Sequence, residues 1–257
     1  MSPKPEGVRD AIERIAAIRI AADPESVMQG AAKRIAEVLT AAVAARGVAT
    51  MALAGGSTPR QVYRLLSAAP HDRAIPWEHV RLFLGDERCV PADHPDSNQR
   101  MVSESLLARL PHAPAFHPMV CGGDAPEDAA ARYRDCLAHE VPDHASGIPR
   151  FDLILLGMGD DAHTASLFPG TSILDETRPV APVFVPEKNS WRMSLTLPVL
   201  NAARHVVFLV TGSSKAQALA AVLGGDPDRE RPASLVRPES GAVEWYVDAA
   251  AAARVPR

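Results

Sequence analysis

The sequence predicts an α/β protein with a mostly parallel sheet and helices on both faces. Two observations carry this prediction: short apolar runs typical of buried strands alternate with segments of helical periodicity, and several of these runs end next to glycine. The chain has 257 residues, of which 47% are hydrophobic and 23% are charged, as in globular proteins. This length favours one α/β domain over residues 1–257, with or without a small subdomain.

The first half of the chain alternates helix and strand. Apolar residues recur at helical spacing over residues 24–45, and a short apolar run at 48–54 then ends at two glycines, as a buried strand does. Ser57 or Thr58 stands where it can cap a following helix. The further elements expected here are a strand at Val80–Leu84, a polar loop at 85–97 and helices at 98–110 and 127–140.

The second half repeats the alternation. A helix is expected at 213–223, directly after a strand, and the stretch 111–123 is the loosest candidate for a boundary. Strands that alternate with helices in this way pair in parallel. The expected strands are 151–156, a weaker one at Val180–Val185, then His205–Val210 and 243–247.

Charge and hydropathy exclude two classes of partner. The formal net charge is -4 with histidines counted neutral, so the basic excess of a nucleic-acid-binding protein is missing. The longest apolar runs are too short to span a bilayer. The N-terminus carries charged residues where a signal peptide needs an apolar segment. We therefore expect neither nucleic acid nor membrane as a partner.

The cysteines point to a reducing compartment. The chain has three, Cys89, Cys121 and Cys136, which is an odd number without a CxxC pair. This pattern argues against a disulfide framework and against a thiolate zinc site. A cytoplasmic protein without disulfides is the expectation.

Four polar segments each follow an apolar strand. Ligands of parallel α/β sheets bind beyond the carboxyl ends of the strands. We therefore expect one composite site built from four loops: GGSTP at 55–59, GDER at 85–88, GMGDDAHTASLFPG at 157–170 and TGSSK at 211–215.

Two of these loops have the features of a phosphate site. Gly56 lets the backbone approach a ligand next to a helix N-terminus, where N–H groups bind anions, and Ser57 and Thr58 add hydroxyl donors. Lys215 stands in the first turn of a helix, against the helix dipole, which favours an anionic partner. Arg192 would complete the clamp. The alternatives are a plain turn and solvated surface cations.

Two common motifs are incomplete in this chain. The first loop nearly fits G-x-S-x-G, but Pro59 replaces the final glycine, which weakens a serine-hydrolase interpretation. Residues 157–162 formally match a dinucleotide fingerprint. Asp160 and Asp161 would repel a pyrophosphate there, and Pro169 prevents the long helix that the motif needs.

His163 is the candidate general base. It follows a strand and stands two residues after Asp161, and an imidazole beside a carboxylate can take a proton near neutral pH. A metal site from His94, His163 and Asp86 is the alternative. The chain has no HExxH helix and no histidine pair at i,i+4 to support it, so no metal is expected.

The motifs GGSTP, GDERCVPADHPDSN, LGMGDDAHTASLFPG and RMSLTLPVLNAARHVVFLVTGSSKA closely resemble, in this order, the 6-phosphogluconolactonase family. The resemblance covers nearly the whole chain. It implies a Rossmann-like sheet without a nucleotide, similar to glucosamine-6-phosphate deaminases and ribose-5-phosphate isomerases. It also implies hydrolysis of 6-phospho-D-glucono-1,5-lactone to 6-phosphogluconate in the pentose phosphate pathway. The enzyme would need no cofactor and act as a monomer or small homo-oligomer.

The resemblance also implies roles for individual residues. His163 matches the family's general base, and Asp161 matches the acidic residue two positions before it. Ala162 departs from the pattern, because the family commonly has glycine there. If the backbone at this position has a positive φ, alanine is strained by about 1 kcal/mol. The substrate- and phosphate-binding residues implied are Gly56, Ser57, Thr58, Asp86, Arg88, Arg192 and Lys215.

Two other functions compete with this interpretation. An amino-sugar phosphate deaminase/isomerase on the same scaffold would share the phosphate loop, the acidic residue and the histidine. That family typically carries a glutamate five residues after the histidine, where this chain has Phe168. A non-catalytic sugar-phosphate sensor is the second competitor, and the intact pair of Asp161 and His163 argues against it.

Overall fold

A seven-stranded sheet forms the centre of the computed structural model, which describes residues 17–121, 123, 125–145, 147–238 and 240–256. The strand order is β1-β12-β11-β8-β2-β3-β5, and every neighbouring pair is parallel. This confirms the predicted parallel α/β sheet. Its strands are β1 (Ala17–Ala21), β2 (Ala49–Leu53), β3 (Val80–Leu84), β5 (Ala115–His117), β8 (Leu153–Gly157), β11 (His205–Val210) and β12 (Ala242–Asp248).

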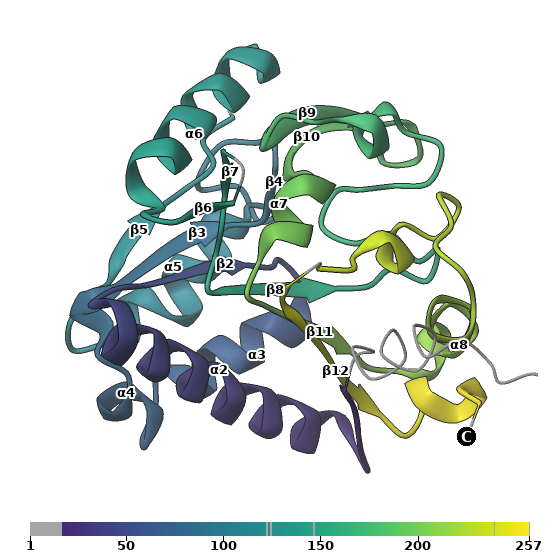
Figure 1. Cartoon of the computed structure of the whole chain (residues 1–257), viewed down its shortest axis with the longest axis horizontal. Coiled ribbons are helices and arrows are strands. Elements are labelled where there is room, and N and C mark those ends of the chain that lie inside the picture. Colours follow the sequence, from purple (N-terminus) through teal and green to yellow (C-terminus); the bar gives the residue numbers. More distant parts are fainter. Residues whose placement is uncertain (1–16, 122, 124, 146, 239, 257) are drawn as a thin grey trace, which may run out of the picture.

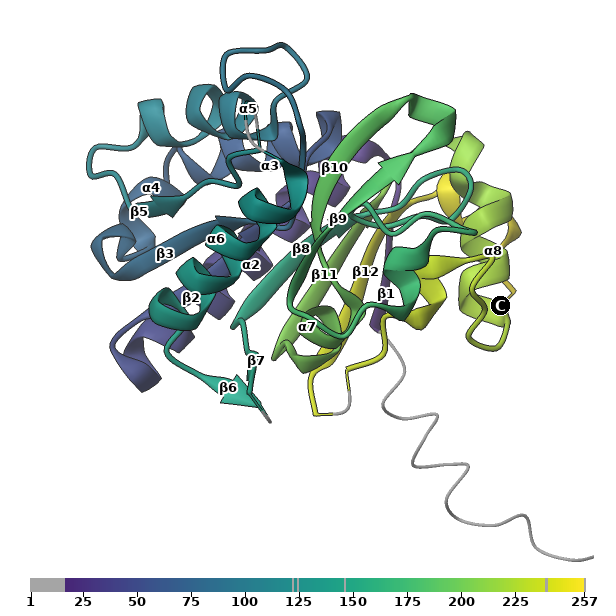
Figure 2. The same ribbon diagram turned by 90° about the horizontal axis from the view of Figure 1, so that it is seen from above.

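Helices cover both faces of the sheet (Figure 1). The helices α2 and α3 lie on one face, and Figure 2 shows α6 and α7 in front of the other. Because both faces are covered, central strands such as β2 are buried along their whole length. The α-helices are α2 (Pro24–Arg46), α3 (Ser57–Leu66), α4 (His71–Ala74), α5 (Asn98–Ser105), α6 (Pro126–Glu140), α7 (Leu197–Ala202) and α8 (Ala216–Gly224).

Short 3-10 turns modify two predicted helices. The helix predicted over 98–110 is α5 followed by one such turn, and the helix predicted from residue 213 begins with another, before α8. The described part of the chain contains the 3-10 turns η1 (Trp77–His79), η2 (Leu107–Arg109), η3 (Ser172–Asp175), η4 (Pro186–Lys188), η5 (Ser213–Lys215), η6 (Pro232–Leu235) and η7 (Ala251–Arg254).

A second, antiparallel sheet lies over the first. It consists of β4 (Asp86–Arg88), β10 (Ser190–Leu195) and β9 (Val180–Val185), in that order. The strand predicted at Val180–Val185 therefore exists but is not part of the parallel sheet. The GDER segment, predicted as loop, is itself a strand, because Asp86–Arg88 pairs with β10. A two-stranded ribbon, β6 (His144–Ala145) with β7 (Ile148–Pro149), completes the strands.

The order in which the chain adds strands to the sheet reverses between β2 and β8. Strands β3 and β5 lie on one side of β2, whereas β11 and β12 lie on the other side of β8. Crevices at such switch points are where ligands of α/β sheets bind. The four polar loops follow β2, β3, β8 and β11, which are four neighbouring strands, so all four meet at the carboxyl edge of the sheet.

Two predictions about the middle of the chain are wrong. The stretch 111–123 is not a loose boundary, since β5 within it pairs with β3. A disulfide joins Cys89 to Cys121, with the two Cα atoms 4.7 Å apart at a sequence separation of 32. An odd cysteine count does not exclude one bond, and Cys136 is the free cysteine. The fold brings Cys89, after β4, next to the segment that follows β5.

Candidate active site

A cavity of about 230 Å³ lies at the carboxyl edge of the parallel sheet. All four polar loops contribute to it, and β10 of the second sheet adds Arg192. The sequence therefore predicted correctly that these loops form one composite surface. The residues from the loops and from β10 that line the cavity include Gly55, Gly56, Gly85, Asp86, Arg88, Gly157, Gly159, His163, Arg192 and Lys215.

His163 and Asp161 are in direct contact. Nδ1 of His163 lies 2.6 Å from Oδ1 of Asp161, which also accepts a 3.1 Å hydrogen bond from the His163 backbone N–H. Burial raises the pKa of Asp161, but the hydrogen bonds from His163 outweigh it and lower the pKa to about 2. The carboxylate is thus charged near neutral pH and favours a proton on Nδ1. Nε2 is then the ring nitrogen that can accept a proton, and the ring lines the cavity.

The loop that carries this pair has an unusual backbone. Any Cβ at Gly159 would overlap both the His163 ring and the Asp161 carboxylate, so glycine alone leaves room for their contact. Ala162 has φ 63°, and Ala165 has φ 48°. The positive φ suspected at Ala162 is therefore present, and both alanines carry left-handed strain. A hydrogen bond from the Ala233 N–H to the Ala162 carbonyl, at 2.9 Å, holds the turn.

Asp86 is a buried carboxylate in the cavity wall. Its Oδ2 accepts a 2.8 Å hydrogen bond from Ser166, and Oδ1 accepts one of 3.3 Å from Asn98. The Asn98 amide also donates to the Asp86 carbonyl, at 2.8 Å, and packs over Gly55 so tightly that no Cβ fits there. Asn98 was not among the predicted site residues. The sequence held a signal for it, because Asn98 is the last residue of the motif GDERCVPADHPDSN and begins α5.

Three cations line the cavity and have no carboxylate partner in the described part of the chain. Arg88 donates to the Asp96 carbonyl at 2.6 Å, while Arg192 and Lys215 make no side-chain hydrogen bond or ion pair there. The Nε atoms of Arg88 and Arg192 are buried without a partner. Burial lowers the pKa of Arg192 and the nearby Asp86 raises it. Such cations favour an anionic ligand.

The GGSTP loop contributes its backbone to the cavity. Gly56 lines the cavity and is the N-cap residue of α3, with φ 109°. The prediction that Ser57 or Thr58 caps this helix is wrong, since the helix begins at Ser57 and no side chain caps it. Ser57 and Thr58 are not among the residues that line the cavity. Thr58 Oγ1 lies 3.2 Å from Thr211 Oγ1 and so links the two predicted phosphate loops.

His94 is not among the residues that line the cavity. Its Nδ1 is 3.1 Å from the Asp96 backbone N–H. The alternative of a metal held by His94, His163 and Asp86 therefore loses one of its ligands. Among the described residues, no group of three or more His, Cys, Asp or Glu side chains is arranged to hold a metal ion.

Sequence similarity to known proteins identifies the family of this chain. The family model described as glucosamine-6-phosphate isomerases/6-phosphogluconolactonase matches residues 22–245. The chain belongs to this family. A protein of Synechocystis sp. named 6-phosphogluconolactonase is 42% identical over 213 residues, or 82% of this chain and 86% of the relative. A rat protein of the same name is 40% identical over 215 residues, covering 80% of each.

The fold agrees with the family as well. The structure of 6-phosphogluconolactonase from Trypanosoma brucei matches with a TM-score of 0.83 and 30% identity, over 94% of this chain and 99% of that one. The family resemblance predicted from the motifs is confirmed, and so is the arrangement of the sheet. The roles of the individual site residues in this family member remain predictions.

Proposed function

We propose that this chain hydrolyses 6-phospho-D-glucono-1,5-lactone to 6-phospho-D-gluconate in the oxidative pentose phosphate pathway. The observation that carries the proposal is the His163–Asp161 pair at a cavity whose cations have no carboxylate partner among the residues that the structure describes. A base and an anion site in one cavity suit a substrate that has both a hydrolysable carbonyl and a phosphate. Relatives of 40–42% identity carry the lactonase name.

The phosphate is proposed to bind where α3 and the turn before α8 begin. Arg192 and Lys215 supply charge, and the backbone at Gly56 supplies N–H donors at a helix N-terminus. Ser57 and Thr58 add hydroxyls once their side chains turn toward the ligand. Fixing the phosphate holds the lactone carbonyl against His163, which converts a bimolecular encounter into an ordered approach.

His163 is proposed to act through water. Nε2 takes a proton from a water molecule as the oxygen attacks C1 of the lactone, and the charged imidazole is stabilised by ionised Asp161. The tetrahedral intermediate then collapses with cleavage of the bond from C1 to the ring oxygen. His163 returns its proton to that oxygen, which leaves the carboxylic acid and a free hydroxyl.

Arg88 is the proposed donor to the oxyanion. The backbone N–H groups of Gly159 and Ala162 are already hydrogen-bonded within the loop, and that of His163 is bonded to Asp161. They are therefore less suited to a developing oxyanion than a guanidinium that lines the cavity with its Nε unpartnered. Asp86, held by Ser166 and Asn98, is proposed to orient substrate hydroxyls.

Two assays test the function. Purified protein is mixed with freshly made 6-phosphogluconolactone, with spontaneous opening subtracted, and separately with glucosamine 6-phosphate. Lactone hydrolysis is expected, whereas ammonia release without lactone hydrolysis would make the chain a deaminase. Binding without turnover of either substrate would make it a sensor. Activity that survives dialysis against a chelator is expected, and loss restored by one divalent ion would contradict the proposed metal independence.

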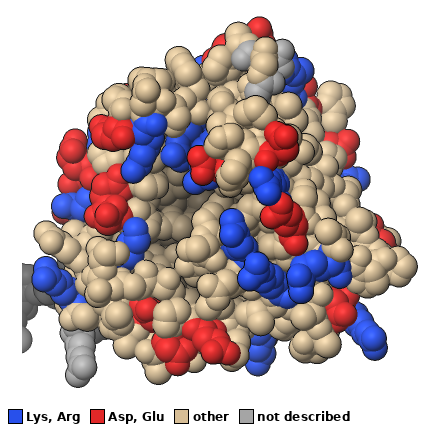
Figure 3. All heavy atoms as spheres, turned by 180° about the vertical axis from the view of Figure 1, so that it is seen from behind, with Lys and Arg blue, Asp and Glu red and all other residues tan. Residues whose placement is uncertain are grey.

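The remaining proposals concern location and partners. We propose a cytoplasmic enzyme, monomeric or a small homo-oligomer, that binds no nucleic acid. Basic and acidic groups are intermixed on the face shown in Figure 3, and no described helix is long and apolar enough to cross a membrane. Because cytosolic thiols are kept reduced, this location requires activity without the Cys89–Cys121 bond.

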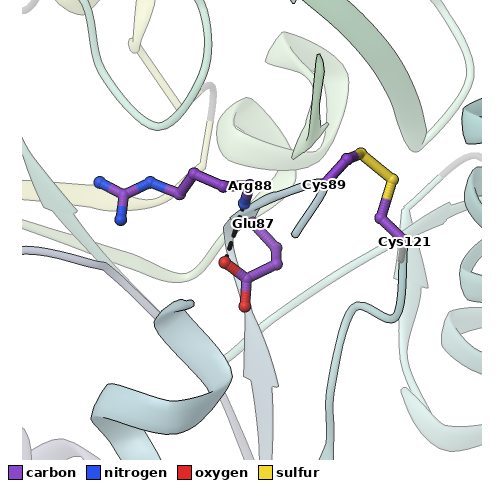
Figure 4. Close-up of a disulfide and its surroundings, with 4 residues drawn as sticks. All are labelled: Glu87, Arg88, Cys89 and Cys121. Atoms are coloured by element: carbon purple, nitrogen blue, oxygen red, sulfur yellow. Dashed lines mark hydrogen bonds between the residues drawn. A yellow bond between two sulfur atoms is a disulfide. The ribbon is translucent and has the colours of Figure 1, made fainter. Parts of the chain in front are cut away.

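The structure supports such independence. Figure 4 shows the Arg88 side chain directed away from the disulfide. The Arg88 backbone N–H is bonded to Glu87 Oε1 at 2.8 Å, and the residue pairs with Arg192 across β4 and β10. Cys121→Ser or added reductant should therefore leave kcat/KM unchanged at 25 °C while it lowers the free energy of unfolding by about 2–4 kcal/mol. Loss of activity on reduction would contradict the cytoplasmic proposal.

A further inference from the structure

One aromatic ring contacts both the base and a cation of the candidate site. Phe168 follows His163 by five residues in the same loop, and its side chain is only 4% exposed. Its ring packs face to face with the His163 imidazole, with centroids 4.0 Å apart and planes 21° from parallel. The guanidinium carbon of Arg192 lies 5.4 Å from the centroid of the same phenyl ring.

The backbone beside this ring is fixed by a tight turn. Thr171 Oγ1 donates a 2.7 Å hydrogen bond to the Phe168 carbonyl, and the Thr171 N–H donates one of 3.3 Å to the same oxygen. The Leu167 N–H is bonded to the Thr164 carbonyl at 2.9 Å. The Phe168 ring is therefore held in one place, and a side chain that packs against it is oriented by the loop.

Packing against Phe168 restrains the His163 ring in a way that the contact with Asp161 alone does not. The hydrogen bond from Nδ1 of His163 to Asp161 fixes one edge of the imidazole but leaves the ring free to pivot about that bond. Face-to-face packing on Phe168 removes the pivot. With both contacts in place, Nε2 keeps one direction.

Arg192 depends on the same ring for a different reason. Its side chain forms no ion pair within the described residues, and its Nε is buried without a hydrogen-bond partner. The face of an aromatic ring attracts a guanidinium and favours parallel alignment of the plane. Arg192 comes from β10 of the second sheet, to which the same loop is also bonded by the Ser166 N–H, which donates to Ser194 Oγ at 3.2 Å. Phe168 therefore adds a side-chain contact between the loop and β10 at Arg192.

Resting on the function proposed above, we propose that Phe168 is a positioning residue that aligns His163 and Arg192 with each other. The distance between base and phosphate clamp is then set by one rigid ring. A lactone held at its phosphate presents C1 to Nε2 only when both groups keep this alignment.

The test is a set of kinetic comparisons with a matched control. Phe168→Leu should lower kcat about 10- to 100-fold, since misplaced groups lose orientation, and raise KM for the phosphorylated lactone about 3- to 10-fold. With unphosphorylated gluconolactone kcat should fall but KM should stay unchanged. The control is Phe208→Leu, which also breaks a buried aromatic stack, with Trp245 at 3.9 Å, but lies outside the cavity lining. It should leave the kinetics of both substrates unchanged.

Double variants separate positioning from a general loss of packing. In an Arg192→Ala background, Phe168→Leu should no longer raise KM, and in a His163→Asn background it should no longer lower kcat. Undiminished effects in these backgrounds, or equal effects of Phe208→Leu, would overturn the proposal. Should Phe168→Leu fail to fold, Phe168→Met fills a similar volume without a ring and gives the same comparison.

A binding measurement keeps this proposal distinct from the proposed function. Titration calorimetry with 6-phosphogluconate reports on the phosphate clamp without any turnover. If the wild-type chain hydrolyses no lactone, the function fails, yet weaker 6-phosphogluconate binding by Phe168→Leu than by Phe208→Leu still supports the alignment of Arg192. Equal binding by both variants would refute that alignment whether or not the lactone is hydrolysed.

Discussion

The two edges of the parallel sheet both gather arginines, but among the described residues most of those at the amino edge have a carboxylate partner, whereas the cations at the carboxyl edge have none. A cavity of about 650 Å³ at the amino edge is larger than the 230 Å³ cavity at the carboxyl edge. Four arginines line the larger one: Arg34, Arg46, Arg150 and Arg204. Size and positive charge alone would therefore favour the amino edge as a binding site.

Carboxylates make the difference. At the amino edge, Asp152 pairs with Arg46 at 2.5 Å and with Arg204 at 3.4 Å, and Glu244 pairs with Arg34 at 2.6 Å. At the carboxyl edge, Arg192 and Lys215 have no such partner among the described residues. Three of the four arginines at the amino edge thus have a carboxylate partner, and the fourth, Arg150, donates to Ser240 Oγ at 3.0 Å. A basic cluster whose charge is mostly balanced stabilises the fold, whereas an unbalanced one can bind an anion.

Helix direction reinforces the contrast. In a parallel α/β sheet the helices begin at the carboxyl edge and end at the amino edge. The start of α3 therefore adds partial positive charge beside Gly56, and the end of α2 adds partial negative charge beside Arg46. We therefore propose that the same residue type binds substrate at one edge and stabilises the fold at the other.

The largest expected effect is at the carboxyl edge. His163→Asn removes the base but roughly keeps the side-chain shape, so kcat should fall about 10²–10⁴-fold while the free energy of unfolding changes little. Asp161→Asn should also lower kcat, because an amide lacks the charge with which the Asp161 carboxylate, its pKa lowered to about 2, favours the proton on Nδ1. The loss should be smaller than for His163→Asn, because the imidazole remains. Steady-state kinetics with spontaneous hydrolysis subtracted measure both. A kcat close to that of the wild type in folded His163→Asn would contradict the proposed role of His163 as the general base.

The amino edge should show the opposite behaviour. Asp152→Ala leaves Arg46 and Arg204 without their shared carboxylate and removes the acceptor of two hydrogen bonds from Thr50, at 2.8 and 3.1 Å. The free energy of unfolding should fall by about 3–5 kcal/mol, with KM unchanged in the folded fraction. Asp175→Ala is the control, since it breaks an exposed pair with Arg229, and its loss of stability should be much smaller. A selective rise in KM for Asp152→Ala would erase the distinction between the two edges.

Lys215→Ala tests whether the unpaired cations at the carboxyl edge bind the substrate phosphate. Loss of a charge-assisted contact should weaken binding of the phosphorylated lactone by about 1.5–3 kcal/mol, which is measured as a higher KM. The KM for unphosphorylated gluconolactone should not change. Lys33→Ala, an exposed lysine of α2, is the matched control. Equal losses on both substrates would place Lys215 outside the phosphate site.

Local patterns in the sequence predicted much of this arrangement. The bounds of Val80–Leu84, Val180–Val185 and His205–Val210 agree with the structure, because short apolar runs between polar turns leave little choice of length. The meeting of four loops followed from the rule that strands of a parallel sheet end at one edge. Polar residues at four strand ends were thus enough to find the cavity.

Contacts between distant segments were not predictable from local patterns. The pairing of Asp86–Arg88 with β10 and the Cys89–Cys121 bond depend on how the second sheet lies over the first. The role of Asn98 needs both the Gly55 loop and Asp86 in place. Ser57 and Thr58 misled because a hydroxyl next to a helix start suits either a cap or the first helical turn.

The smallest expected effect concerns strain within the loop that carries Asp161 and His163. Ala162 and Ala165 both have positive φ, so glycine at either position relieves about 1 kcal/mol of left-handed strain, offset in part by the greater freedom of glycine in the unfolded chain. The two sites differ in burial: the Ala162 methyl is 1% exposed, whereas Ala165 is only partly buried and lines the cavity. Losing a buried methyl costs about 0.8 kcal/mol. Ala165→Gly should therefore be more stable than Ala162→Gly by about 0.5–1 kcal/mol in urea unfolding, and the reverse order would show that the strain at the two alanines is unequal.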